Sequence, residues 1–153
     1  MLLPVSTEAP KPKLAEELKG VPRGKGELVL LIEDDEALLA LVKETLDGLG
    51  YTVMAASSGF EALEMTQDAE RHVDLIVSDV VMPGLSGIEL AAILADRYPT
   101  ARVVFMSGYP SRGDRDYGQL PEGACFVQKP VKANELARVV REQLDRVELQ
   151  EAV

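Results

Sequence analysis

From residue 28 onward, two patterns of apolar and polar positions take turns along the chain. Short apolar runs recur between longer segments in which apolar residues return every three or four positions. A short, continuous Val/Ile/Leu run is typical of a strand buried on both faces, whereas the longer period is typical of a helix packed on a sheet. The runs that we interpret as strands are residues 28–32, 51–55, 74–78, 102–106 and 124–128.

The segments between these runs carry helix signals. Leu38, Val42 and Leu46 recur at helical spacing after the first run. The Ser-x-x-Glu sequences at 58–61 and 86–89 match capping boxes, in which the two side chains satisfy free backbone donors of the first helical turn. We therefore expect a helix after each of the first three strands.

The segment GYPSRGDRDYGQLPEG, residues 108–123, is the weakest part of the pattern. Pro110, Gly113 and Gly118 interrupt it, and both residue types break helices. We expect the fourth helix, if it forms, to be short or irregular.

Strands that alternate with helices, without internal repeats, predict an α/β domain. In such a domain a parallel sheet is covered by helices on both faces, which gives a three-layer sandwich. Ligands of these sheets bind beyond the carboxyl ends of the strands. Residues that directly follow the strands are therefore the candidate site.

The N-terminal region, residues 1–26, lacks this periodicity. It contains four prolines and three glycines in a charged setting, and only LAEEL has a spacing that suits a helical turn. We therefore predict a flexible linker over residues 1–26, a folded domain over residues 27–148 and a short tail over residues 149–153.

Composition narrows the functional classes. A chain of 153 residues with 46% hydrophobic residues suits one domain, and its net charge of −10 argues against a nucleic-acid partner. The single cysteine, Cys125, cannot form an internal disulfide, and no apolar stretch approaches the roughly 20 residues needed to cross a bilayer. We expect a cytoplasmic protein without membrane contact.

Charged residues and a hydroxyl follow the predicted strands. Glu33 and Asp34 follow the first, Asp79 the third, Ser107 the fourth and Lys129 the fifth. Carboxylates about 4 Å apart repel by roughly 4 kcal/mol per pair at an effective dielectric constant near 20, so the acids call for a cation. Oxygen ligands alone, without His or Cys, favour a hard ion such as Mg²⁺ or Mn²⁺.

A carboxylate, a divalent ion, a hydroxyl and an ammonium group around one point suit phosphoryl transfer. The cations neutralise charge on the transferring group, the hydroxyl donates to it, and a carboxylate can act as nucleophile. Asp79 is the natural nucleophile because it stands alone after the central run, which leaves Glu33 and Asp34 for the metal.

Four motifs, LIEDDEALL, DLIVSDVVMPGLSGIEL, VVFMSGYP and FVQKP, occur in the order found in a known family. They resemble the motifs of the CheY-like receiver domain of two-component response regulators, over about residues 27–148. The resemblance implies a (βα)₅ flavodoxin-like fold with strand order 2-1-3-4-5.

The resemblance also implies a role for each acid. Asp79 is the phosphoacceptor, which takes a phosphoryl group from the phosphohistidine of a histidine kinase or histidine phosphotransfer domain. Asp34 and Asp79 bind Mg²⁺ directly, Glu33 acts through water, and the backbone carbonyl of Val81 completes the protein ligands. Asp34 with Asp35 is an alternative acid pair; the motif favours Glu33 with Asp34 and leaves Asp35 to cap the first helix.

The remaining site residues follow from the same resemblance. Lys129 pairs with the phosphoryl group, and Pro130 fixes the loop that aims it, for which a cis peptide bond is one means. Ser107 is the switch hydroxyl, and Phe126 occupies the position of the switch aromatic, although a core role suits it equally.

Two further positions bear on access and lifetime. Gly108, next to the switch hydroxyl, leaves the site open to a bulky donor. Val81 and Tyr109 occupy positions that tune dephosphorylation in the family, and neither carries an acid or amide that positions water. We expect a phosphoryl lifetime longer than that of fast-cycling members.

We expect a phosphorelay receiver that catalyses its own phosphorylation and dephosphorylation without being a turnover enzyme. The wording of SGYP and LPEG…FVQKP is most like the C-terminal receiver of a hybrid sensor histidine kinase. A stand-alone receiver that signals by protein binding, or as a homodimer through the face of the fourth helix, fifth strand and fifth helix, is the alternative. An aspartate-nucleophile phosphatase would need an acid at Val81 and is disfavoured.

Overall fold

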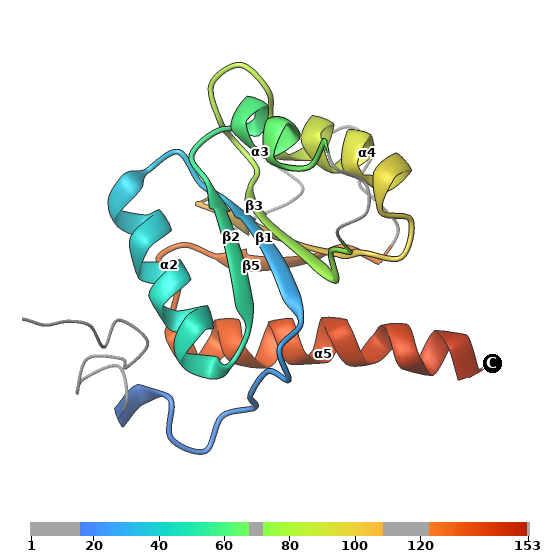
Figure 1. Ribbon diagram of the computed structural model, residues 1–153. Coiled ribbons are helices and arrows are strands. Elements are labelled where there is room, and N and C mark those ends of the chain that lie inside the picture. The colour runs from blue at the N-terminus through green and yellow to red at the C-terminus, as the bar shows by residue number, and fades with distance from the viewer. Residues whose placement is uncertain (1–15, 68–71, 109–122, 153) are drawn as a thin grey trace, which may run out of the picture.

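The architecture is a five-stranded parallel sheet covered by helices on both faces, seen in a computed structural model (Figure 1). The structure describes residues 16–67, 72–108 and 123–152, with side chains as far as residue 146. The sheet order is β2-β1-β3-β4-β5, which confirms the predicted fold and strand order. The strands are β1 (Leu28–Ile32), β2 (Thr52–Ala56), β3 (Leu75–Asp79), β4 (Arg102–Ser107) and β5 (Cys125–Gln128).

Four helices of the described residues form the two outer layers. Helices α2 and α5 cover one face of the sheet, and α3 and α4 cover the other (Figure 1). Their bounds are α2 (Glu36–Leu49), α3 (Gly59–Met65), α4 (Gly87–Arg97) and α5 (Ala133–Ala152). None of the described helices is both long and apolar enough to cross a membrane.

Neighbouring residues of one strand point into different layers. Leu31 lies in the apolar cluster under α2 and α5, whereas Leu30 and Ile32 lie in the cluster under α3 and α4. All three side chains are fully buried. The continuous apolar runs of the sequence thus reflect burial on both faces, as predicted.

The helix ends bear out several local signals. Asp35 caps α2 by accepting hydrogen bonds from the amides of Ala37 and Leu38. The capping box of Ser86 and Glu89 is complete at the start of α4. At α3 only half of the box forms, because the carboxylate of Glu61 accepts from Ser57.

Two expected features lie outside the sheet: the irregular fourth helix and the N-terminal linker. The short or irregular fourth helix falls mainly on residues 109–122, which lie outside the described residues. Residues 18–26, expected to be part of a linker, pack against α2 and α5, and Leu18 is only 1% exposed.

Candidate functional site

The candidate site lies where the carboxyl ends of the strands meet. Parallel pairing aligns Asp79 with Met106 and Ser107 with Gln128, so β3, β4 and β5 end at one edge. Glu33, directly after β1, is held there by a hydrogen bond from its amide to the carbonyl of Ala56, 3.1 Å. The register of the sheet, rather than nearness in sequence, assembles the site.

Three carboxylates gather at this edge. Glu33, Asp34 and Asp79 each offer an oxygen, and these oxygens lie within 4.8 Å of one another. Glu33 is fully buried, Asp79 is 6% exposed and Asp34 is exposed. Asp35 caps α2 instead, so the structure groups Glu33 and Asp34, rather than Asp34 and Asp35, with Asp79.

Lys129 lies between two of these acids. Its Nζ is 3.1 Å from Oε1 of Glu33 and 3.2 Å from Oδ2 of Asp79. The amide of Lys129 donates to the carbonyl of Ser107, 2.7 Å, which fixes the start of the loop after β5. The next peptide bond, Lys129–Pro130, is cis.

Burial and charge shift the pKa values of the three groups. Burial raises the pKa of Glu33 to about 7, opposed by the amide hydrogen bond from Asp35 and reinforced by the charge of Asp79. Burial also raises the pKa of Asp79, although Lys129 opposes the rise. Burial alone would lower the pKa of Lys129, but the carboxylates of Glu33 and Asp79 raise it above its usual value. The site therefore has a deficit of positive charge.

The donor set fits a hard divalent cation. Oxygen atoms are the ligands that Mg²⁺ and Mn²⁺ prefer, and all three acids supply them. Among the described residues, Oε1 of Glu33 is buried and has no partner with hydrogen-bond geometry, although the Lys129 ammonium lies nearby. A buried, incompletely satisfied carboxylate oxygen is what a metal or its bound water would complete.

The other predicted residues lie in or directly after strands β3, β4 and β5. Ser107 ends β4 and is 6% exposed, and Phe126 lies in β5, half-buried, with its ring centroid 5.6 Å from that of Phe105. Gly108 is exposed, and a Cβ there would meet no described atom within 4 Å. Val81 is 52% exposed, just beyond Asp79.

Sequence reasoning missed Gly87, the first residue of α4. A Cβ at this position would collide with the carbonyl oxygen of Asp79 and approach Oγ of Ser78. The Gly87 amide also donates to the carbonyl of Val80, 2.9 Å. Gly87 therefore lets α4 start directly against the backbone of Asp79. Its place after the PG turn and beside Ser86 was the available signal.

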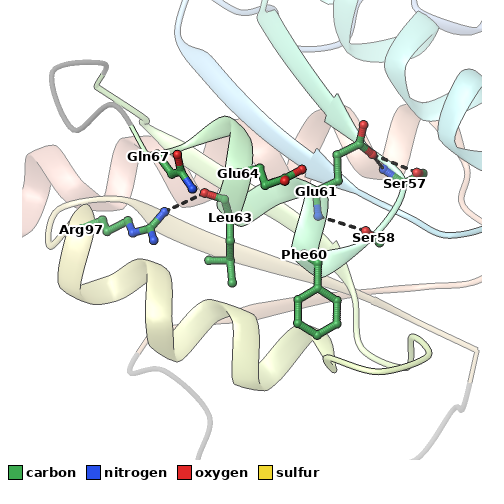
Figure 2. Close-up of a pocket in the computed structure, with 8 residues that line it drawn as sticks. All are labelled: Ser57, Ser58, Phe60, Glu61, Leu63, Glu64, Gln67 and Arg97. Atoms are coloured by element: carbon green, nitrogen blue, oxygen red, sulfur yellow. Dashed lines mark hydrogen bonds between the residues drawn. The ribbon is translucent and has the colours of Figure 1, made fainter.

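A separate concavity lies between α3 and α4, and none of Glu33, Asp34 and Asp79 lines it. It has a volume of about 610 Å³ and is lined by residues that include Ser58, Phe60, Glu64 and Arg97 (Figure 2). The Arg97 guanidinium is already used, because it donates to the carbonyl of Leu63 and to Oγ1 of Thr66. The concavity contains none of the predicted site residues.

Comparison with known proteins identifies the family. The response regulator receiver domain family matches residues 29–141, a range that contains the acidic site and all of the sheet except Leu28, the first residue of β1. The chain therefore belongs to this family, and it is a receiver domain of two-component systems.

Individual relatives include a sensor kinase and response regulators. The sensor kinase CckA of Brucella abortus is 37% identical over 145 residues, which cover 94% of this chain and 15% of the kinase. The transcriptional regulatory protein YrkP of Bacillus subtilis is 34% identical, over 77% of this chain and 49% of that protein. This chain thus spans half or less of these two relatives. The response regulator DivK of Brucella ovis is 27% identical over 76% of this chain and 94% of its own length.

Solved structures of receiver domains have the same fold as this chain. The receiver domain of the hybrid histidine kinase CckA is 33% identical with a TM-score of 0.66, covering 76% of this chain and 98% of that one. A CheY-like receiver domain from Methanospirillum hungatei is 25% identical with a TM-score of 0.70, over 82% and 99% of the two chains.

Proposed function

We propose that this receiver domain accepts a phosphoryl group on Asp79 from a phosphohistidine. The observation that carries the proposal is the position of the Lys129 ammonium, 3.2 Å from Oδ2 of Asp79 and 3.1 Å from Oε1 of Glu33. An amine that close to a nucleophilic oxygen can neutralise charge on a group attached there. The exposed Gly108 and Val81 flank the site and leave a path for a donor.

The reaction is a transfer between two side chains. A carboxylate oxygen of Asp79 attacks phosphorus, the P–N bond to the donor imidazole breaks, and its electron pair stays on that nitrogen. Lys129 then neutralises negative charge on the new acyl phosphate. Asp34 and Asp79, the carbonyl of Val81 and, through water, Glu33 would hold Mg²⁺ or Mn²⁺. When bound, the ion supplies charge neutralisation for the transferring group.

The proposed signal is a change in side-chain arrangement around Asp79. Phosphorylation would add a dianionic group at the strand edge, and we infer that the hydroxyl of Ser107 donates to it. Ser107 lies at the end of β4, which pairs directly with β5 and Phe126. We infer that the Phe126 side chain moves when Ser107 moves. This movement changes the shape of the surface formed by β5 and α5, through which partners or a second copy of the chain would bind.

The proposed context is the receiver of a hybrid sensor histidine kinase, in the cytoplasm. Support comes from the sequence match to the CckA kinase over 94% of this chain and from the likeness to the CckA receiver structure. A stand-alone response regulator is the second candidate, because the match to DivK covers 94% of that protein. The gene sequence upstream of residue 1 separates the two: a kinase domain in the same reading frame supports the first.

Intact mass spectrometry tests the proposed chemistry. The protein is incubated with acetyl phosphate, with and without Mg²⁺, beside Asp79→Asn and the matched control Asp35→Asn, which keeps a helix-capping side chain. We expect one phosphoryl group on the unchanged chain and on Asp35→Asn, only with Mg²⁺, and none on Asp79→Asn. A folded, Mg²⁺-binding protein that gains no mass would overturn the proposal.

A further inference from the structure

Residues 16–27, called here the N-terminal strap, lie against the side of the domain formed by α2 and α5. They approach the end of α2 and the beginnings of β1 and β2. They therefore lie at the amino ends of the strands, whereas the acidic site lies at the carboxyl ends (Figure 1). Leu18, 1% exposed, belongs to the same buried cluster as Leu49, Tyr51 and Leu144. The strap thus contributes an apolar side chain to the core between the two helices.

The strap also completes the end of α2. The amide of Gly24 donates to the carbonyl of Leu49, 2.7 Å, and the amide of Gly26 donates to the carbonyl of Gly50, 3.0 Å. The guanidinium of Arg23 donates to the carbonyl of Gly48, 3.0 Å. The last carbonyls of a helix lack partners within the helix, so these donors satisfy groups that would otherwise need water.

Arg141 ties the strap to α5. Its guanidinium donates to the carbonyl of Arg23, 3.3 Å, and pairs with Glu27, 3.0 Å, and with Asp145 of its own helix, 3.0 Å. The side chain of Arg141 is only 13% exposed, so screening by solvent is limited. One cation therefore joins two residues of the strap, Arg23 and Glu27, to the helix α5.

The contact with Tyr51 leaves no space for a side chain at position 24 of the strap. A Cβ at Gly24 would lie 2.6 Å from Cδ1 of the Tyr51 ring, which is itself 4% exposed. The absence of a side chain at Gly24 is therefore required by docking, and a free linker would place no such demand on this position.

We propose that the N-terminal strap is docked against α2 and α5 and acts as a rigid connection between residue 16 and β1, not as a flexible linker. The strap thereby fixes the point at which the chain joins the domain at residue 16, beside α2 and α5, instead of at Leu28, where β1 begins. The family match begins only at residue 29, whereas the match to the CckA kinase covers so much of the chain that it includes the strap. The strap is therefore additional to the receiver fold. The proposal is independent of the chemistry proposed for Asp79.

Amide hydrogen exchange of the complete chain tests this proposal. We expect the amides of Gly24 and Gly26 to exchange at least about tenfold more slowly than in an unstructured peptide, because both are hydrogen-bonded to carbonyl groups of the domain. Exchange at the free-peptide rate for both amides would overturn the proposal.

Two variants that disrupt the contacts of the strap, and one control variant, extend the test. Leu18→Ser removes the buried anchor, Gly24→Ala introduces the collision with Tyr51, and Lys19→Ser changes an exposed neighbour. We expect both test variants to speed exchange at Gly26 and around Arg141 and to lower the melting temperature, with Lys19→Ser unchanged. In all three variants the rate of phosphorylation should stay within about twofold of the rate of the unchanged chain. The reason is that the strap lies at the amino ends of the strands and the acidic site at the carboxyl ends. Gly24→Ala as stable and as protected as the unchanged chain would contradict docking, since that substitution in a free linker is harmless.

Discussion

The Nζ atom of Lys129 lies 3.2 Å from Oδ2 of Asp79, although the two residues are 50 positions apart in the sequence. Lys129 follows β5, and Asp79 ends β3, with β4 between the two strands. The pair is therefore formed across a strand, by side chains that reach beyond the carboxyl edge of the sheet.

This contact leads to a prediction for Lys129→Met. Removing the ammonium withdraws charge neutralisation from the group on Asp79, so phosphorylation from acetyl phosphate should slow by about 10- to 1,000-fold. The matched control is Lys132→Met, which alters an exposed lysine of the same loop. Equal rates for the two variants, measured by intact mass over time, would show that Lys129 plays no part in the reaction.

The raised pKa of Glu33 predicts a pH dependence of stability without divalent ions. Its pKa is about 7 in the folded protein and 4.5 in an unfolded chain, so between these values the folded state binds more protons than the unfolded state. The free energy of unfolding should therefore be highest below pH 4.5 with respect to this group and should fall as pH rises to about 7. The loss amounts to at most about 3 to 4 kcal/mol, at about 1.4 kcal/mol per pKa unit.

Denaturant unfolding in the presence of a chelator, at several pH values between about 5 and about 8, measures this effect. Glu33→Gln cannot titrate and should show a flatter profile than the unchanged chain. The raised pKa of Asp79 acts in the same direction, so a residual slope is expected in the variant. Identical slopes for both proteins would rule out Glu33 as a source of the dependence.

Gly87→Ala should slow phosphorylation even though alanine favours a helix. The added Cβ would collide with the carbonyl oxygen of Asp79, so the backbone of the nucleophile must move. Alanine for glycine inside a helix is otherwise worth up to about 1 kcal/mol of stability. The variant should lose stability and phosphorylate at least about tenfold more slowly, because misplacement of a reacting group is costly.

The control is Ala95→Gly, at an exposed position of the same helix. It should cost up to about 1 kcal/mol of stability without affecting the rate of phosphorylation. A Gly87→Ala protein that is both more stable and equally reactive would show that α4 can shift without disturbing Asp79.

The exposed, apolar Val81 predicts a long-lived phosphoryl group. A side chain without hydrogen-bonding groups cannot orient water for attack on phosphorus. We expect a half-life well above seconds, and Val81→Asn should shorten it by supplying an amide beside the site. Decay is followed by intact mass after removal of the small phosphodonor, with Val81→Ala as a control for lost volume alone. A half-life of seconds in the unchanged chain would contradict this prediction.

Much of the site could be predicted because its residues follow strands. The apolar runs of the sequence marked the strand ends to within one residue, and the rule for parallel sheets placed Asp79, Ser107 and Lys129 at one edge. Gly87 was missed because its role is steric. The need for glycine arises from the approach of α4 to the backbone of Asp79, and no local pattern reports that distance.

The sequence by itself determined the strand positions and the residue types gathered at the carboxyl ends of the strands, because burial on both faces and helix capping leave local patterns. The strand order was predicted from the family motifs. The tertiary structure decided that Glu33 turns into the site while Asp35 caps α2, and that Lys129 lies between two carboxylates. It also decided that residues 16–27 dock. The contact between Arg141 and Arg23 joins residues 118 positions apart, and a contact over such a separation produces no periodicity from which it could be predicted.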